Sequence, residues 1–170
     1  MNFTASLIDV MLHLDKYLNI IIQNYGTFTY AIIFIVIFCE TGLVVTPFLP
    51  GDSIIFTAGA LAAENILGVF TLFIVFFAAA VLGDTANYFI GKKIGNNILK
   101  SKNTRFVNKE HIYKAHRFYE KHGPMAIVLG RFVPVIRTFV PFVAGIGEMK
   151  YFKFLTHNML GGFLWVSMFL

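Results

Sequence analysis

Two arginines inside one apolar stretch are the residues of this sequence best suited to binding an anion. Arg131 and Arg137 are six residues apart in Arg-Phe-Val-Pro-Val-Ile-Arg. In an unbroken helix of about 3.6 residues per turn their side chains would point about 120° apart, but Pro134 between them removes that constraint. Two converging guanidinium groups offer a fork of donors that suits a phosphate or a carboxylate. The alternative is that each arginine neutralises an acid or extends to the membrane surface.

Two acids lie in an earlier apolar stretch, which runs from Glu40 to Asp52. A low-dielectric cavity favours the neutral form of an acid, whereas a neighbouring arginine favours its charged form. A substrate that occupied the arginine would therefore change whether the acid holds a proton, which is a physical route to proton coupling. The alternative is static, with Glu40 and Asp52 pairing with Arg131 and Arg137 to hold the two stretches together. The sequence leaves both readings open.

A third acid, Asp84, is the only charged residue of the apolar run 66–90. We expect it to hold the second broken stretch or to relay protons toward the cytoplasm, which adds it to Glu40 and Asp52 as a proton-coupling residue. The alternative is a residue near a helix end that pairs with Lys92 or Lys93.

The other polar and aromatic signals predict no catalytic or metal chemistry. His111, His116 and His122 are spaced by five and six residues, so they do not share a helix face as an i, i+4 pair would, and we expect no metal site. His157 is expected to make an interior polar contact and Trp165 to anchor the chain at the membrane interface. No G-x-S-x-G, Walker, Cys-x-x-Cys or H-E-x-x-H pattern is present. We therefore expect no enzyme and no cofactor.

The composition predicts an integral membrane protein. The chain is 57% hydrophobic, has a mean hydropathy of +0.71 and is only 14% charged, against about 25% charged residues in soluble domains. Nine of the 14 lysines and arginines lie in residues 91–122. A basic block between apolar regions predicts a cytoplasmic segment by the positive-inside rule, and this location disfavours nucleic-acid binding.

Proline and glycine interrupt two of the apolar stretches. An interior proline removes a backbone hydrogen bond, and broken backbone is tolerated at membrane depth only where protein or a wet cavity satisfies it. We therefore expect two re-entrant helical hairpins, over residues 40–63 and 125–147. The residues expected to break them are Pro47, Pro50, Gly51, Pro134 and Pro141.

The remaining segments have simpler patterns. Residues 6–22 predict an amphipathic interfacial helix, and the chain can first cross the bilayer between residues 17 and 38. Residues 66–90 are long enough to cross a hydrocarbon core of about 30 Å. Residues 151–170 predict the start of a C-terminal transmembrane region that is truncated at the last residue.

These segments predict an all-α membrane protein of one domain, residues 1–170. With residues 91–122 inside, the first hairpin opens outward, the second opens inward, and a span follows each. This is the hydropathy pattern of an inverted repeat, which many secondary transporters use, with the binding site where the broken helices meet. We expect transmembrane helices and two opposed re-entrant hairpins in a pseudo-inverted repeat.

Three motifs together resemble the bacterial DedA membrane proteins. They are F-C-E-T-G-L-V-V-T-P-F-L-P-G-D-S over residues 38–53, G-D-x-x-x-Y-x-x-G-K-K-x-G over 83–95, and F-Y-E-K-H-G followed by G-R-F-V-P-V-I-R-T-F-V-P-F-V-A-G. The resemblance covers nearly the whole chain, although the family continues through a further C-terminal helix. It implies opposed re-entrant hairpins, with the family's functional acids at Glu40 and Asp52 and its arginines at Arg131 and Arg137.

The resemblance also implies a function and its partners. It implies a flippase of the bacterial inner membrane that depends on the proton-motive force and recycles the lipid carrier undecaprenyl phosphate, so that the partners are an anionic lipid and protons. One alternative is a proton-coupled antiporter of small cations or drugs that uses the two acids. Another is a phospholipid scramblase or membrane-homeostasis protein. The sequence leaves the oligomeric state open between a monomer and a homo-oligomer.

Overall fold

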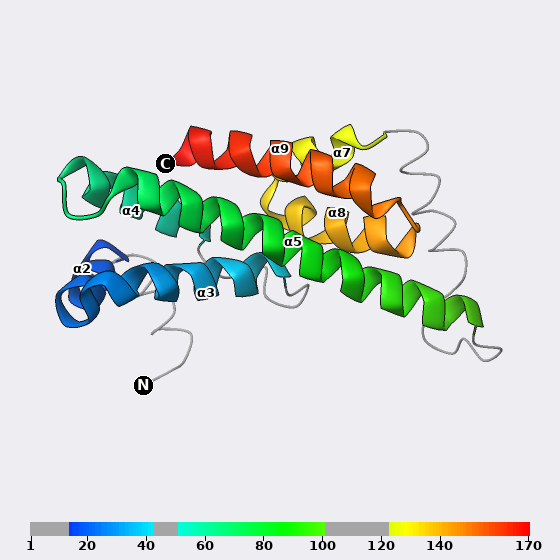
Figure 1. The fold of residues 1–170 in the computed structure, drawn as a ribbon, viewed down its shortest axis with the longest axis horizontal. Coiled ribbons are helices and arrows are strands. Elements are labelled where there is room, and N and C mark those ends of the chain that lie inside the picture. The colour runs from blue at the N-terminus through cyan, green and yellow to red at the C-terminus, as the bar shows by residue number, and fades with distance from the viewer. Residues whose placement is uncertain (1–13, 43–50, 101–122) are drawn as a thin grey trace.

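The described part of the chain is built from helices and short turns. A computed structural model describes residues 14–42, 51–100 and 123–170, and these residues form no strand (Figure 1). The elements are α2 (Leu14–Tyr25), the 3-10 helix η1 (Gly26–Phe28), α3 (Thr29–Gly42), α4 (Gly51–Ala63), α5 (Val69–Lys100), α7 (Met125–Gly130), α8 (Pro134–Ile146) and α9 (Tyr151–Phe169). The predicted all-α class is confirmed.

Two helical segments are long and apolar enough to cross a membrane. They are Lys16–Gly42, which joins α2, η1 and α3, and Val69–Gly95 within α5. Val69–Gly95 lies within one continuous helix, so at about 1.5 Å per residue its 27 residues rise about 40 Å and exceed a hydrocarbon core of about 30 Å. Lys16–Gly42 is not one straight helix, because η1 and the left-handed Gly26, with φ of 52°, separate α2 from α3.

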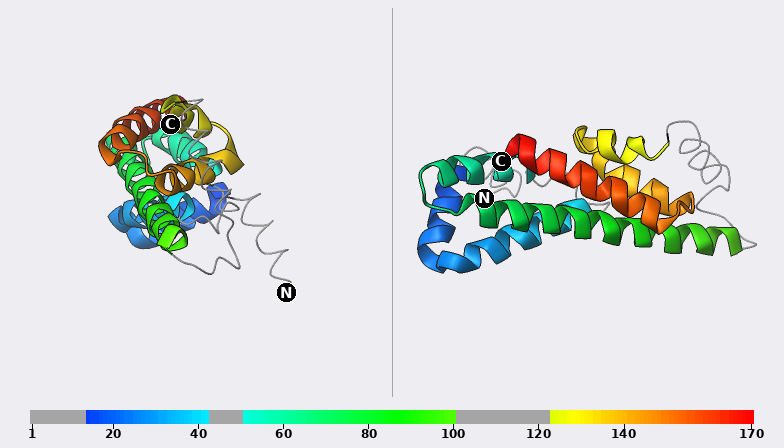
Figure 2. Two further views of the ribbon diagram at one scale, coloured as in Figure 1. Left: turned by 90° about the vertical axis from the view of Figure 1, so that its right-hand side faces the viewer. Right: turned by 45° about the horizontal axis from the view of Figure 1, so that its top comes forward.

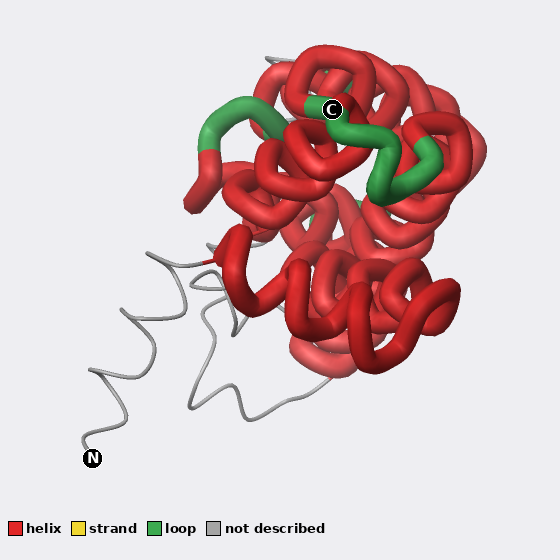
Figure 3. Tube along the Cα trace, turned by 90° about the vertical axis from the view of Figure 1, so that its left-hand side faces the viewer, coloured by secondary structure: helices red, strands yellow, loops and turns green. Residues whose placement is uncertain are grey.

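Helix α5 is the central element of the bundle. It packs against α3 on one side and against α8 and α9 on the other, and its length is visible in two views (Figures 1 and 2). Helix α4 lies at the end where α5 begins and contacts α2, α3, α5 and α9. Seen along the bundle, short turns join the helices at this end (Figure 3).

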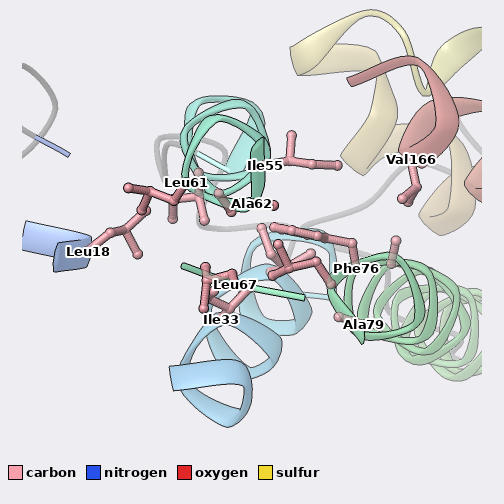
Figure 4. Packing of buried hydrophobic residues seen from close by; sticks show 14 of the residues in the cluster. Leu18, Ile33, Ile55, Leu61, Ala62, Leu67, Phe76, Ala79 and Val166 are labelled. Carbon is pink, nitrogen blue, oxygen red and sulfur yellow. The ribbon is translucent and has the colours of Figure 1, made fainter. Parts of the chain in front are cut away.

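Two apolar clusters hold the helices together. The larger one joins α3, α4, α5 and α9 around residues such as Ile33, Ile55, Phe76 and Val166 (Figure 4). The smaller one contains Tyr88, Ile127, Val140, Ala144 and Phe154 and joins α5, α7, α8 and α9. The first cluster fixes α4 against the bundle, and the second fixes α8.

Charged and apolar side chains are placed as a bilayer requires. Large apolar side chains face outward, including Phe28, Phe56, Phe70 and Phe152. Among the described residues, four charged side chains are buried instead: Glu40, Asp84, Arg131 and Arg137. In water this would leave extensive apolar surface exposed and charges desolvated, whereas in lipid it places apolar groups against hydrocarbon and charges against protein.

The second stretch with prolines contains a break between helices. Helix α7 ends at Gly130, residues 131–133 form a turn, and α8 begins at Pro134, where proline's missing N–H costs no helix bond. Pro141 lies inside α8 without ending it. In the first stretch α3 ends at Gly42 and α4 begins at Gly51, while the predicted breakers Pro47 and Pro50 lie outside the described residues.

The turns that follow the two 13-residue helices α4 and α8 share one hydrogen-bond pattern. Ile66 N–H donates to the carbonyl of Leu61, five residues back, and Met149 N–H donates likewise to Ala144, both at 3.1 Å. The residue before each of these donors is left-handed, with φ of 59° at Asn65 and 54° at Glu148. A left-handed residue with a bond to the last turn is a common helix ending, and a span or a long helix follows each one here.

Several predicted boundaries need correction. The interfacial helix expected over residues 6–22 is described only from Leu14, where α2 continues to Tyr25 and leads into the first span. Glu40, the expected first residue of the first hairpin, lies in the last turn of α3. Helix α5 continues ten residues beyond the expected end at residue 90, because Gly91 and Gly95 let its backbone pack closely on α8. Residues 101–122, with the three histidines, lie outside the described part.

Candidate functional site

An ion pair joins helix α8 to helix α4. Arg137 on α8 donates from Nη1 to Asp52 Oδ1 on α4 at 2.6 Å. The arginine side chain is 5% exposed, whereas the aspartate side chain is 40% exposed. The guanidinium carbon also lies 4.6 Å from the ring centre of Trp165, within range of a cation–π interaction. Arg137 is therefore covered by α9 on one side and held by a carboxylate that is partly open on the other.

Glu40 completes this cluster from α3. Its side chain is buried, and its carboxylate lies against the backbone of Gly51, the first residue of α4. A helix N-terminus favours a carboxylate, because its backbone N–H groups and dipole favour negative charge. Arg137 and Asp52 are the charged groups that act on Glu40, and within the described residues its Oε2 has no hydrogen-bond partner.

Gly51 is required by this arrangement. A Cβ atom built on it would overlap the Glu40 carboxylate. Glycine at the start of α4 thus serves a close approach of an acid from α3, in addition to the break predicted from the sequence.

A second ion pair lies between α5 and the turn after α7. Arg131 donates from Nη2 to Asp84 Oδ2 and, at 2.6 Å, to Asn158 Oδ1 on α9. Asn158 in turn donates to the carbonyl oxygen of Val81 at 3.0 Å. The Arg131 and Asp84 side chains are 4% and 7% exposed. The pair is satisfied by protein groups on three elements.

Two glycines of α9 allow close packing, Gly162 against Arg131 and Gly161 against the backbone of α7. A Cβ atom on Gly162 would lie 2.7 Å from Arg131 Nη1, and one on Gly161 would lie 3.2 Å from Val128 Cα. This contact explains the Gly-Gly pair in the middle of a long apolar helix. Among the described residues Arg131 Nη1 has no hydrogen-bond partner.

The structure brings together three of the four residues that the sequence singled out as acid and arginine partners. Glu40, Asp52 and Arg137 meet at the beginning of α4. Arg131 pairs elsewhere, with Asp84, although Arg137 also lies close enough to Asp84 to act on it electrostatically. The two arginines thus belong to neighbouring but separate ion pairs.

Two of the minor sequence interpretations are wrong. Trp165 is 1% exposed and lies under Arg137, so it is an interior contact and not an interface anchor. The interior polar group is Asn158, since the neighbouring His157 bonds only to its own helix through Lys153 and Thr156. The signal in the sequence that could have identified this group was Asn158 itself, an asparagine inside an apolar run.

A further amide, Asn87, lies between the helices that bear the first cluster. It is fully buried on α5 and donates to the carbonyl oxygens of Thr138 on α8 and Thr41 on α3. Its role could not be predicted from the sequence, because the spacing of Asp84, Asn87 and Tyr88 on one helix does not reveal which neighbours they meet.

The fold and the site define a helical membrane protein with two charge clusters buried at the meeting points of its helices. Residues 49–170 match the VTT domain. Over 171 aligned residues the chain is 47% identical to protein DedA of Escherichia coli (strain K12), which covers 99% of this chain and 78% of that protein. The chain therefore belongs to the DedA family.

Two more distant relatives are also membrane proteins by name. Inner membrane protein YqjA of Escherichia coli (strain K12) is 32% identical over 137 residues, covering 81% of this chain and 62% of that protein. An uncharacterised membrane protein of Mycobacterium tuberculosis (strain H37Rv) is 43% identical over 137 residues, covering 78% and 59% respectively. No solved structure matches the chain.

Proposed function

We propose that this protein is a flippase that uses the proton-motive force to move undecaprenyl phosphate across the bacterial inner membrane. The observation that carries the proposal is the Arg137–Asp52 pair beside Glu40. It combines a buried cation for a lipid phosphate with two acids that can exchange protons. The proposed activity makes and breaks no covalent bond in the lipid, so the protein acts as a transporter and not as an enzyme.

A phosphate can compete with Asp52 for Arg137. Both are oxygen anions, and a guanidinium group binds either one through parallel N–H donors. Asp52 is the partly exposed partner, so an arriving headgroup displaces it without first opening the buried side. The apolar exterior of the bundle lets the lipid tail remain in the hydrocarbon while the headgroup enters.

Displacement of Asp52 provides the coupling to protons. When a phosphate occupies Arg137, the two carboxylates lose a counter-charge and lie near each other and near an added anion. A low-dielectric site cannot hold this excess negative charge, so a proton binds to Glu40 or Asp52. Release of the lipid restores the ion pair and releases the proton.

Arg131 and Asp84 form the second station of the proposed path. Support comes from Arg131 Nη1, which is buried and has no hydrogen-bond partner in the described part of the chain. In the resting state this pair holds the turn after α7 against α5. Arg131 binds phosphate only once Asp84 takes up a proton and releases it.

The proposed topology is two opposed re-entrant hairpins in a pseudo-inverted repeat, with residues 91–122 in the cytoplasm. Its support is the correspondence between α4 and α8, each 13 residues long and each ending in the same hydrogen-bonded turn. The basic character of residues 91–122 supports their orientation. This arrangement would expose the charge clusters to alternate sides as the helices move.

The test is transbilayer movement of labelled undecaprenyl phosphate in liposomes with an imposed pH gradient. Arg137→Gln is expected to reduce gradient-driven movement at least tenfold, because it removes the buried cation. Lys93→Gln is the matched control, since it removes an exposed cation from α5 and is expected to leave the rate within twofold.

The same assay separates the alternatives. A cation or drug antiporter would require Glu40 and Asp52 but would keep its activity in Arg137→Gln. A scramblase would move lipid equally with and without the gradient. Movement of the labelled lipid by Arg137→Gln at the wild-type rate would exclude the proposed phosphate site.

A further inference from the structure

Asn87 connects α5 to backbone groups on two opposite neighbours. Its Nδ2 lies 2.7 Å from the carbonyl oxygen of Thr138 on α8 and 3.4 Å from that of Thr41 on α3. Because both neighbours are acceptors, the amide must present its NH₂ group to them. One side chain of α5 therefore donates to both α3 and α8, which are not consecutive along the chain.

The two carbonyl groups belong to residues next to the charged cluster. Thr41 follows Glu40 in the last turn of α3. Thr138 follows Arg137 on α8, in the turn before Pro141. Asn87 thus bonds to α3 and α8 at the residues next to Glu40 and Arg137 in the sequence.

The backbones around Asn87 are packed closely. A Cβ atom on Gly42 of α3 would lie 3.3 Å from the carbonyl oxygen of Gly83 on α5, and one on Gly145 of α8 would lie 2.7 Å from the backbone nitrogen of Lys92. Small displacements of α3 or α8 therefore reach α5 directly, because tightly packed elements move together and do not deform freely.

The two donated hydrogen bonds account for the NH₂ group of Asn87 but not for its carbonyl oxygen. Asn87 is fully buried, and no described group donates to its Oδ1. Buried acceptors without a donor are uncommon in folded proteins, and each requires an explanation. A leucine of similar size would avoid this acceptor but would remove the two bonds to α3 and α8.

We propose that Asn87 is a positioning residue that sets the separation of Glu40 and Arg137, so that protonation of Glu40 and the state of the Arg137–Asp52 pair depend on each other. The charged groups facing this cluster are Asp52 of α4, which acts on Glu40, and Asp84 of α5, which acts on Arg137. The inference rests on the proposed proton-coupled function. It identifies how α3, which carries Glu40, and α8, which carries Arg137, are held at a fixed separation.

The test measures coupling between Glu40 and Arg137 without using transport. A hydrophobic carbodiimide modifies protonated carboxyl groups, and mass spectrometry of the Glu40 peptide gives its labelling rate at fixed pH. In the wild-type background Arg137→Gln is expected to change this rate at least tenfold, because the nearby positive charge is lost. In an Asn87→Leu background the same change is expected to have less than a threefold effect.

The matched control is Asn24→Leu, which removes an exposed amide that bonds only within α2, to Ile20. It should retain the tenfold response. A tenfold response in Asn87→Leu would overturn the proposal. If Asn87→Leu does not unfold cooperatively, Asn87→Asp, which removes the NH₂ group at equal size, is judged by the same criterion.

Two further outcomes have defined meanings. If both variants fail to fold while Asn87→Gln folds and shows the wild-type response, the amide is needed only for folding and the positioning role is overturned. If wild-type liposomes move no lipid but the labelling responses are as expected, the proposed function fails while the role of Asn87 stands.

Discussion

The two buried ion pairs use the same chemical groups in different surroundings. Arg131 and Asp84 are both almost fully covered, and Asn158 supplies a third partner. Arg137 is covered to the same extent, but its partner Asp52 is 40% exposed and its other neighbour is the face of Trp165. Both members of the first pair are covered by protein, whereas the acidic member of the second pair, Asp52, is partly exposed.

This difference gives the two ion pairs different roles: one holds helices in place, and the other can exchange its carboxylate for another anion. Removing one partner of a fully buried pair leaves an uncompensated charge in low dielectric and costs about 3–5 kcal/mol. A pair with a solvent-accessible partner is worth about 0–1 kcal/mol, because water or another anion replaces the lost group. Arg131–Asp84 is thus suited to fixing helices as long as Asp84 is charged, and Arg137–Asp52 to exchanging a carboxylate for a substrate anion.

The largest expected effect is that of Asp84→Ala. It leaves Arg131 buried without its carboxylate and should lower the free energy of unfolding by about 3–5 kcal/mol, measured by denaturation in detergent. Glu64→Ala, which removes an exposed acid from the turn after α4, should change stability by less than about 0.5 kcal/mol. Equal effects of the two substitutions would mean that the closed pair does not stabilise the fold.

The next effect is that of Gly162→Ala. The new Cβ atom would lie 2.7 Å from Arg131 Nη1, and because Asp84 and Asn158 hold this arginine it has no room to retreat. We expect a loss of about 1–3 kcal/mol in the same denaturation measurement. Gly68→Ala is the control, since its nearest neighbour would be at an ordinary 3.5 Å. If Gly162→Ala left the stability unchanged, Arg131 would have room to move, which would contradict the view that the Arg131–Asp84 pair is enclosed by protein.

A smaller effect on stability, with a distinct optical signature, is expected for Arg137→Gln. Loss of the cation–π contact costs about 0.5–2 kcal/mol. Trp165 is the only tryptophan of the chain, so its fluorescence reports this contact directly. The emission should change in Arg137→Gln and remain as in the wild type in Arg131→Lys. An unchanged spectrum in Arg137→Gln would place the guanidinium away from the indole.

The smallest effect is expected for Asp52→Ala. Because Asp52 is partly exposed, its removal should cost only about 0–1 kcal/mol in unfolding experiments, while gradient-driven lipid movement falls at least tenfold. Asp52→Asn serves as the size-matched variant. A stability loss comparable with that of Asp84→Ala would show that both pairs are structural and would remove the distinction drawn here.

The fold class and the charged residues followed from local sequence patterns, whereas their pairing did not. Asp84 was predicted to hold the second broken stretch or relay protons, or else to pair with Lys92 or Lys93. Its partner in the structure, Arg131, lies in that stretch, but the sequence did not indicate which arginine it would meet. All these pairings are compatible with one hydropathy profile, since the profile records which residues enter the membrane and not which helix faces meet. Asn158 was absent from the prediction for the same reason.

The sequence by itself determined that the protein is helical, that it belongs in a membrane, and which ionisable side chains lie among apolar residues. These properties depend on composition and on the positions of proline and glycine along the chain. Only the tertiary structure decided that Arg131 is enclosed with Asp84 and that Arg137 lies beside the buried Glu40 and the partly exposed Asp52. The physical reason is that exposure and partners depend on close helix crossings, such as that at Gly162, where groups far apart in sequence set the space available to one guanidinium.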